Sequence, residues 1–346
     1  MNWESLEWDI LDRLRADFLS GAAANGPYWH TITDLECYNF TFGQRIAWKW
    51  DAVLAELKLR GWRPPAGGTV LDWGCGSGIA GRQVVSYLGA ENVGRLVVHD
   101  HSPLAMDFSA HHAARAFPAL AVERASPAFL GGHEPIGVLV LSHVLNELHD
   151  ADLTALGALL NRAASVLWVE PGNHEVSRVL GHWRKRLLGP FQVVAPCPHQ
   201  GACGILAAGN EQHWCHFFAP VPSGIHADAG WVKFGQRAGI DLRSLPYSFV
   251  ALQRPDLPVS GALRPTPGNA GDDPRRPEPS RIIGAPRLYK GYAKLFNCDS
   301  TGVIELTLQK RTDPALFKAL KHGADPQLYC WTREGTTITG VETKST

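Results

Sequence analysis

The feature that most constrains the fold is a short apolar strand that runs directly into a glycine-rich turn. Residues 69–78 read Thr-Val-Leu-Asp-Trp-Gly-Cys-Gly-Ser-Gly. Glycine tolerates a left-handed backbone and lets the main chain approach a ligand closely. A helix is predicted directly after the turn, from Ile79 to Leu88. This order of strand, glycine turn and helix is typical of a ligand-binding unit in an α/β protein.

Strands and helices continue to alternate after this unit. Further strands are predicted at 95–99, 120–124, 136–141 and 165–170, with helices over 103–117 and 152–164 between them. The strand over 136–141 is apolar throughout, as expected for a strand buried on both faces. This alternation predicts an α/β, doubly wound, mostly parallel sheet of the Rossmann-like kind. Ligands of such sheets bind outside the carboxyl ends of the strands.

Two acidic residues flank the glycine turn. Asp72 opens the pattern Asp-x-Gly-x-Gly-x-Gly, and Asp100 follows the second strand, where a ribose-binding acid is expected. The pattern resembles motif I of class I S-adenosylmethionine-dependent methyltransferases. An acid at Asp72 suits the ammonium group of that cofactor better than it suits a pyrophosphate. A fold that is retained without a cofactor is the alternative.

The candidate cofactor site draws on this turn and on the polar residues after the fourth strand, 142–149. No residue there is an obvious catalytic base, so the catalytic residues are not predicted. The residues expected to bind S-adenosyl-L-methionine are Asp72, Gly74, Gly76, Gly78, Asp100, Ser142 and Asn146.

A second feature is a concentration of cysteines. Cys197, Cys203 and Cys215 lie within nineteen positions, in a Pro/Gly-rich segment without periodicity. A fourth cysteine, Cys298, is predicted in the turn of a hairpin formed by 287–296 and 302–310. Clustered thiols in such a segment are typical of a metal or iron–sulfur centre, because the metal replaces a core that the segment cannot build.

The spacing Cys-x5-Cys-x11-Cys leaves two kinds of centre open. A zinc site could take His199, His213 or His216 as its fourth ligand. An iron–sulfur site would need Cys298.

Composition excludes some classes of protein. The chain has 33 basic and 33 acidic residues, which argues against binding nucleic acid with its whole surface but not with a local basic run such as 184–186. No apolar run reaches the ~18–20 residues of a membrane span. The acidic segment 1–9 resembles no export signal, and seven cysteines without such a signal indicate a reducing compartment. We therefore expect a cytoplasmic protein with no membrane partner.

The patterns divide the chain into five parts. They are an N-terminal helical cap over 1–62, a methyltransferase-like domain over 63–192, the cysteine segment and a returning strand over 193–253, a Pro/Gly-rich loop over 254–281, and a C-terminal β-hairpin extension over 282–346. We expect the metal centre to staple this small β extension to the rest of the chain.

Several short motifs follow one another in a characteristic order. They are Ser-His-Val-Leu-Asn-Glu-Leu (142–148), Val-Glu-Pro-Gly (169–172), Val-Ala-Pro-Cys-Pro-His (194–199), Trp-Cys-His-Phe (214–217) and Tyr-Ser-Phe-Val-Ala-Leu (247–252), followed by the hairpin with Cys298. This order resembles the Rsm-type mitochondrial small ribosomal subunit family, methyltransferase-like proteins that also have bacterial members. The resemblance covers roughly residues 40–325.

The resemblance implies association with the small ribosomal subunit and its rRNA, and a role in assembly or translation. It also implies a [4Fe-4S] centre held by Cys197, Cys203, Cys215 and Cys298. We accordingly expect an S-adenosylmethionine-dependent methyltransferase that is monomeric away from the ribosome. Two other functions stay open: a non-catalytic assembly factor with the same fold, and a small-molecule methyltransferase with structural zinc.

Overall fold

The computed structural model describes residues 1–21, 28–257, 278–322 and 328–342. The chain forms two compact units. Unit 1 comprises Met1–Ala55, Arg63–Glu170 and Ala219–Leu245, and unit 2 comprises Glu56–Trp62, Pro171–Phe218 and Pro246–Thr346. The five predicted parts have other boundaries than these units and stay a prediction. Most of the predicted loop over 254–281 lies outside the described residues.

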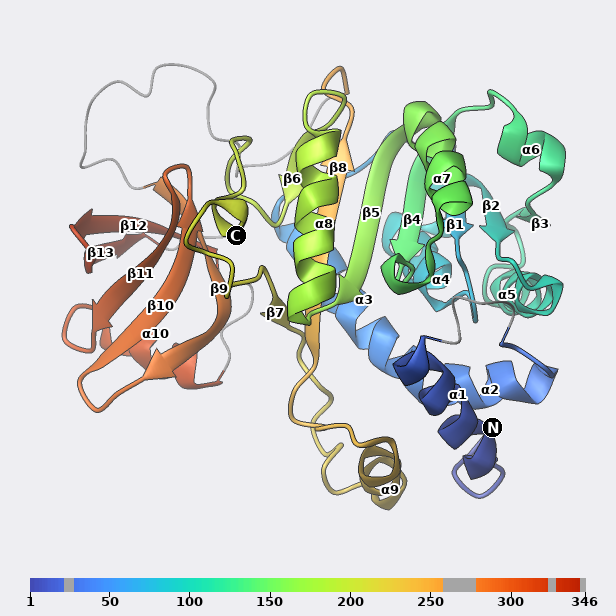
Figure 1. Cartoon of the computed structure of the whole chain (residues 1–346), viewed down its shortest axis with the longest axis horizontal. Helices are drawn as coiled ribbons and strands as arrows, with labels where there is room; N and C mark the ends of the chain where they lie inside the picture. The colour runs from blue at the N-terminus through green and yellow to red at the C-terminus, as the bar shows by residue number, and fades with distance from the viewer. Residues whose placement is uncertain (22–27, 258–277, 323–327, 343–346) are drawn as a thin grey trace. The chain divides into compact units, whose positions relative to one another are not determined.

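Unit 1 is built on a parallel sheet. Its strands are β1 (Gly68–Trp73), β2 (Val93–His99), β3 (Val122–Arg124), β4 (Ile136–Ser142) and β5 (Ala163–Pro171). They lie side by side in the order β3-β2-β1-β4-β5, and each neighbouring pair is parallel (Figure 1). The mostly parallel α/β fold predicted from the alternation is confirmed.

Helices connect these strands. They are α4 (Ile79–Leu88), α5 (Pro103–Ala116), α6 (Pro127–Gly131) and α7 (Asp150–Arg162). The Ser102 side chain accepts a hydrogen bond from the amide of Ala105, and Pro103 occupies the first turn, so the sequence itself defines where α5 begins. In β4, Leu139, Val140 and Leu141 are fully buried, which explains why this strand is apolar throughout.

The N-terminal part of unit 1 is helical. It contains α1 (Trp8–Ser20), α2 (Ile32–Phe40) and the start of α3 (Phe42–Leu59), whose last residues belong to unit 2. Thr31 and Asp34 form a capping box that begins α2, each side chain accepting from the backbone of the other. Unit 1 also contains α9 (Ala229–Ala238).

Unit 2 begins with the end of α3, followed by α8 (His174–Leu187). Strand β8 (Pro246–Gln253) of this unit pairs antiparallel with both β6 (Gln192–Ala195) and β7 (Phe217–Phe218). Four short 3-10 turns occur in the described parts of the two units, at Ala90–Asn92, Leu145–Glu147, Gly204–Leu206 and Leu320–His322.

The C-terminal part of unit 2 is a closed barrel, coloured orange to red in Figure 1. Its strands are β9 (Glu278–Leu288), β10 (Tyr292–Asp299), β11 (Gly302–Gln309), β12 (Leu328–Glu334) and β13 (Thr337–Glu342), joined in the order β10-β11-β13-β12-β9, with α10 (Pro314–Ala319) between β11 and β12. The predicted hairpin is present as β10 and β11. The strands that close the barrel were not predicted from the sequence.

Cys298 was predicted in the turn of that hairpin, and this was wrong. It lies inside β10, opposite Val303 of β11 and Arg281 of β9. Its side chain is only 8% exposed. The antiparallel register therefore directs this thiol into the interior of unit 2.

No helix of the described part is long and apolar enough to cross a membrane.

Candidate functional site

The glycine turn after β1 is held in a backbone conformation that favours glycine. Gly74, Gly76 and Gly78 have φ values of 74°, 49° and 71°. A Cβ atom at Gly78 would lie 2.0 Å from Ser109 Oγ, and one at Gly74 would lie 2.6 Å from Val144 Cγ1. The turn therefore depends on glycine both for its conformation and for its close packing.

Asp100, at the end of β2, is bonded to this turn. One carboxylate oxygen accepts a hydrogen bond from the amide of Gly76 at 2.8 Å, and the other accepts from the amide of Ser102 at 2.9 Å. Burial raises the pKa of Asp100, while these two amides work in the opposite direction. Each carboxylate oxygen has a further lone pair, so Asp100 can still accept from the hydroxyl groups of a ligand.

Asp72, the acid that opens the glycine pattern, is completely buried. Its Oδ2 accepts from the amide of Gly81 at 3.0 Å, while Oδ1 has no hydrogen-bond partner among the described residues. Burial raises the pKa of Asp72 to about 7. A buried carboxyl group with a free oxygen has capacity for a positively charged or hydrogen-donating partner.

Of the polar residues after β4 that were expected to bind the cofactor, Ser142 is hydrogen-bonded and partly buried, whereas Asn146 is exposed. Ser142 Oγ accepts from Trp50 Nε1 at 3.0 Å and lies 3.2 Å from His143 Nδ1. Asn146 is exposed in the 3-10 turn Leu145–Glu147. The structure thus brings the turn, Asp72, Asp100 and Ser142 to the carboxyl ends of β1, β2 and β4. Cofactor binding by these residues stays a prediction.

Two further acids lie at this edge, Glu147 within the predicted stretch 142–149 and Glu170 at the end of β5, although neither was among the residues expected to bind the cofactor. Glu170 Oε1 accepts from Trp168 Nε1 at 2.7 Å and from the amide of Val144 at 3.1 Å, and burial raises the pKa of Glu170 to about 7. Glu147 lies 3.4 Å from the Tyr28 hydroxyl, and burial raises its pKa to about 8. An acid at the end of an apolar strand was the signal that could have identified Glu170.

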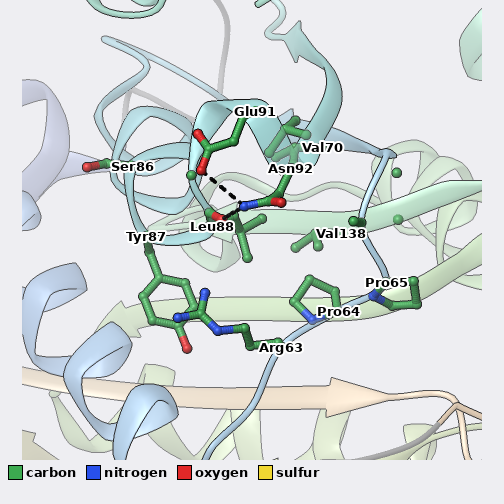
Figure 2. A pocket seen from close by; sticks show the side chains of 15 residues that line it. Arg63, Pro64, Pro65, Val70, Ser86, Tyr87, Leu88, Glu91, Asn92 and Val138 are labelled. Carbon is green, nitrogen blue, oxygen red and sulfur yellow. Dashed lines mark hydrogen bonds between the residues drawn. The ribbon is translucent and has the colours of Figure 1, made fainter.

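A cavity of about 460 Å³ lies at the opposite edge of the sheet (Figure 2). Gly68 and Gly137, at the amino ends of β1 and β4, line it, and the Arg63 guanidinium lies 5.5 Å from the centre of the Tyr87 ring. Because β1 starts at this cavity and ends at the glycine turn, the cavity is separate from the predicted cofactor site.

The four predicted metal ligands all belong to unit 2. Cys197 and Cys203 follow β6, Cys215 precedes β7, and Cys298 lies in β10. None of the four is in a disulfide. Cys203, Cys215 and Cys298 pack in one apolar cluster, together with the side chains Ile205, Ile283, Phe296 and Val303.

A buried arginine of α8 contacts the remaining thiol, that of Cys197. Arg184 is 3% exposed, and its Nε donates to Cys197 Sγ at 3.1 Å. Its Nη2 donates to the carbonyl oxygens of His199 and Gly201, while Nη1 has no hydrogen-bond partner among the described residues. Arg184 belongs to the basic run 184–186, which was a candidate for contact with nucleic acid, and its burial excludes that role for this residue.

The structure does not assemble a metal site from these residues. Within the described ranges, no group of three or more His, Cys, Asp or Glu side chains is arranged to hold a metal ion. Of the histidines considered for zinc, His199 Nε2 lies 3.5 Å from Cys298 Sγ. His213 instead packs on Phe296, with ring centres 4.6 Å apart, and His216 stacks on Trp214 at the same separation. The expected metal staple is therefore not supported, either as an iron–sulfur or as a zinc centre.

Comparisons with solved structures give weak likenesses to methyltransferases. The 16S rRNA methyltransferase RmtF, in complex with S-adenosyl-L-homocysteine, is 12% identical with a TM-score of 0.37, over 70% of this chain and 75% of that chain. The magnesium protoporphyrin IX methyltransferase ChlM of Synechocystis PCC 6803, with bound SAM, is 11% identical with a TM-score of 0.37, over 72% of this chain and 98% of that chain.

A search of curated proteins gave no match. A family of proteins does match, under the description mitochondrial small ribosomal subunit Rsm22, and the match extends over residues 49–325. Since this range covers most of the chain, the protein belongs to the Rsm22 family.

Proposed function

We propose that this protein is an S-adenosylmethionine-dependent methyltransferase that acts on the small ribosomal subunit and its rRNA. Membership of the Rsm22 family supports the ribosomal part of the proposal. The observation that carries the enzymatic part is the glycine turn after β1, at the carboxyl edge of a parallel sheet. The amide of Gly76 in this turn donates a hydrogen bond to the Asp100 carboxylate. Ligands of such sheets bind at this edge.

The residues present fit the cofactor. A Cβ atom at Gly76 would meet nothing nearer than Trp29, at 3.8 Å, so the backbone there is open to close approach, and Asp100 would accept hydrogen bonds from ribose hydroxyls. Asp72 is completely buried, so it would favour the positive charge of the cofactor's amino group from inside the fold rather than by direct contact. When bound, the cofactor supplies a methyl group on a sulfonium ion. The protein's task is then to orient the acceptor in line with that methyl group.

Calorimetry of S-adenosylhomocysteine binding to the full chain tests the proposal. We expect the wild type to bind and Asp100→Asn to bind at least about 10-fold more weakly, because a charge-assisted hydrogen bond is lost. Asp107→Asn, which changes an exposed acid on α5, is the matched control. A folded wild-type protein that does not bind the ligand would favour the non-catalytic assembly factor.

We further propose that Cys197, Cys203, Cys215 and Cys298 hold a [4Fe-4S] centre within unit 2. Three of these thiols share an apolar cluster, and the fourth accepts a hydrogen bond from a buried guanidinium. Thiolate ligands carry negative charge, which Arg184 would offset. The described side chains do not form a ready ligand set, so the thiols would have to move together on binding.

Metal analysis of protein purified without oxygen tests this centre. We expect a brown protein with about four irons per chain. A colourless protein with about one zinc would instead indicate three cysteines and a histidine, and would favour the small-molecule methyltransferase.

Binding to purified small ribosomal subunits tests the partner. Lys185 and Arg186 are exposed on α8, where they could contact phosphates of the rRNA. We expect a change of both residues to alanine to weaken binding and to make the affinity less dependent on salt concentration. The proposal also includes a monomeric state away from the ribosome and a cytoplasmic location. Sedimentation of the free protein and cell fractionation test these two points.

A further inference from the structure

Lys49 of α3 and His143, directly after β4, form a polar pair in unit 1. The distance between Lys49 Nζ and His143 Nε2 is 3.0 Å. Among the described residues, His143 is the one non-glycine residue with a positive φ, at 59°. Such a conformation is strained for a residue with a Cβ and is characteristic of functional sites. The backbone thus adopts an unfavourable conformation where it presents this ring to Lys49.

The other ring nitrogen of His143 is also engaged. Nδ1 lies 3.2 Å from Ser142 Oγ, which accepts from Trp50 Nε1 at 3.0 Å. A neutral imidazole carries one hydrogen. When Lys49 is an ammonium group, it donates to Nε2, so the hydrogen lies on Nδ1 and is donated to Ser142. The ring is therefore held from both sides, with Nε2 as an acceptor for Lys49.

The charged and titratable groups around Lys49 come from three elements. They are Arg45, one turn earlier on α3, Glu170 at the end of β5, and His143. Burial, followed by the charge of Arg45, lowers the pKa of Lys49 to about 7, while Glu170 works in the opposite direction. Burial and then Lys49 lower the pKa of His143 well below its ordinary value. Near neutral pH the imidazole is thus neutral, and the amine can gain or lose a proton.

The pair borders the candidate cofactor site and is not fully enclosed by protein. Val144, the neighbour of His143, packs against Gly74 of the glycine turn and donates its amide hydrogen to Glu170. Lys49 and His143 are both partly exposed. A methyl acceptor that approaches this edge of the sheet would therefore meet the lysine amine.

We propose that Lys49 accepts the proton that the methyl acceptor loses, and that His143 positions its amine. This inference rests on the proposed methyltransferase function. The acceptor's lone pair, on a nitrogen or oxygen that carries hydrogen, forms a bond to the methyl carbon. The carbon–sulfur bond breaks and leaves its electron pair on sulfur. The hydrogen of the acceptor passes as a proton to Lys49 Nζ, which becomes an ammonium ion.

Methyl transfer from radiolabelled S-adenosylmethionine to small ribosomal subunits, taken from cells that lack this protein, tests the inference. We expect Lys49→Met to reduce the rate about 100-fold or more, as for the loss of a general base, with unchanged affinity for S-adenosylhomocysteine. Lys58→Met is the control, because Lys58 is exposed on the same helix. The wild-type rate should rise with pH through a midpoint near 7, and this dependence should be absent in Lys49→Met.

Variants of His143 distinguish positioning from packing. His143→Gln retains a hydrogen-bond acceptor for Lys49 and should retain more activity than His143→Leu. A readout without turnover is acetylation at neutral pH, in which Lys49 should react faster than Lys58.

The outcomes separate this inference from the proposed function. If the wild type fails to bind S-adenosylhomocysteine or to transfer methyl groups, the proposed function is wrong and this inference fails with it. If the wild type does both while Lys49→Met shows the same rate and pH profile, the inference alone is overturned.

Discussion

At the scale of single residues, unit 1 contains two buried carboxyl groups whose pKa values are raised. Burial raises the pKa of both Asp72 and Glu170 to about 7. A single Asp or Glu in water is ionised at this pH, so both groups carry a free-energy cost in the folded protein. Perturbed acids at one edge of a sheet are more typical of a binding or catalytic site than of a core.

The free-energy cost of burying the ionised Asp72 carboxylate leads to a prediction for the stability of the protein. Because its pKa in the folded protein exceeds the ordinary value near 4, the folded state binds this proton more tightly than the unfolded chain. Its contribution to stability is therefore complete in acid and is lost as pH rises from about 4 to about 7. We expect Asp72→Asn to be more stable than the wild type at neutral pH by roughly 3–4 kcal/mol.

Urea unfolding across this pH range measures the difference. The advantage of Asp72→Asn should shrink towards zero in acid, while the exposed change Asp107→Asn should have little effect at any pH. A neutral-pH stability equal to that of the wild type would show that Asp72 is not held against a large desolvation cost.

Arg184 gives a second prediction at this scale. Its guanidinium donates to Cys197 Sγ and to two carbonyl oxygens of the loop that follows. Arg184→Met removes the positive charge beside the proposed ligands and leaves buried carbonyl groups without donors. We expect iron per chain to fall sharply in Arg184→Met and to be partly restored in Arg184→Lys, as measured by metal analysis. Arg186→Met, exposed on the same helix, should retain its iron. Full iron in Arg184→Met would contradict the assigned role.

At the scale of elements, the sequence predicts the parallel sheet well because its signals are local. An apolar run of seven residues such as Ile136–Ser142 is too short for a typical buried helix, so its length favours a buried strand, and the Ser102–Pro103 pair favours the start of a helix. The barrel was missed for the opposite reason. Strand β12 pairs with β9 across a long stretch of intervening chain, and β13 pairs with β11, so no neighbouring residues indicate the closure.

Cys298 links the barrel to the proposed centre and supports a prediction for β10. We expect Cys298→Ser to increase hydrogen exchange and protease cleavage in 282–310, because one ligand that holds this segment is lost. The difference from the wild type should disappear once iron is removed from both proteins with a chelator. Cys330→Ser, a change at another buried cysteine of the same barrel, should not lower iron content. Unchanged exchange in iron-loaded Cys298→Ser would argue against Cys298 as a ligand.

At the scale of the molecule, the candidate site was predicted only in part. The glycine turn and Asp100 follow from a pattern in adjacent residues. Lys49 and His143 lie 94 residues apart, and their contact depends on how α3 packs in unit 1. The thiol of Cys298 likewise enters the interior through strand register rather than through a motif. Sequence patterns therefore identify the backbone of the site, while the partners of its side chains require the fold.

Because the proposed cofactor site lies in unit 1 and the proposed iron–sulfur centre in unit 2, we expect S-adenosylhomocysteine and iron to stabilise different parts of the chain. S-adenosylhomocysteine at about 100 times its Kd should stabilise the unit that binds it by ~2.7 kcal/mol. We expect protection from hydrogen exchange to increase in unit 1 at 74–78 and 142–147, with no change in the barrel. Removal of iron should instead lower protection in unit 2, around 197–215 and in β10. Exchange measured by mass spectrometry on the full chain, with each treatment alone, checks both. Protection of the barrel by S-adenosylhomocysteine would show that the ligand does not act on unit 1 alone.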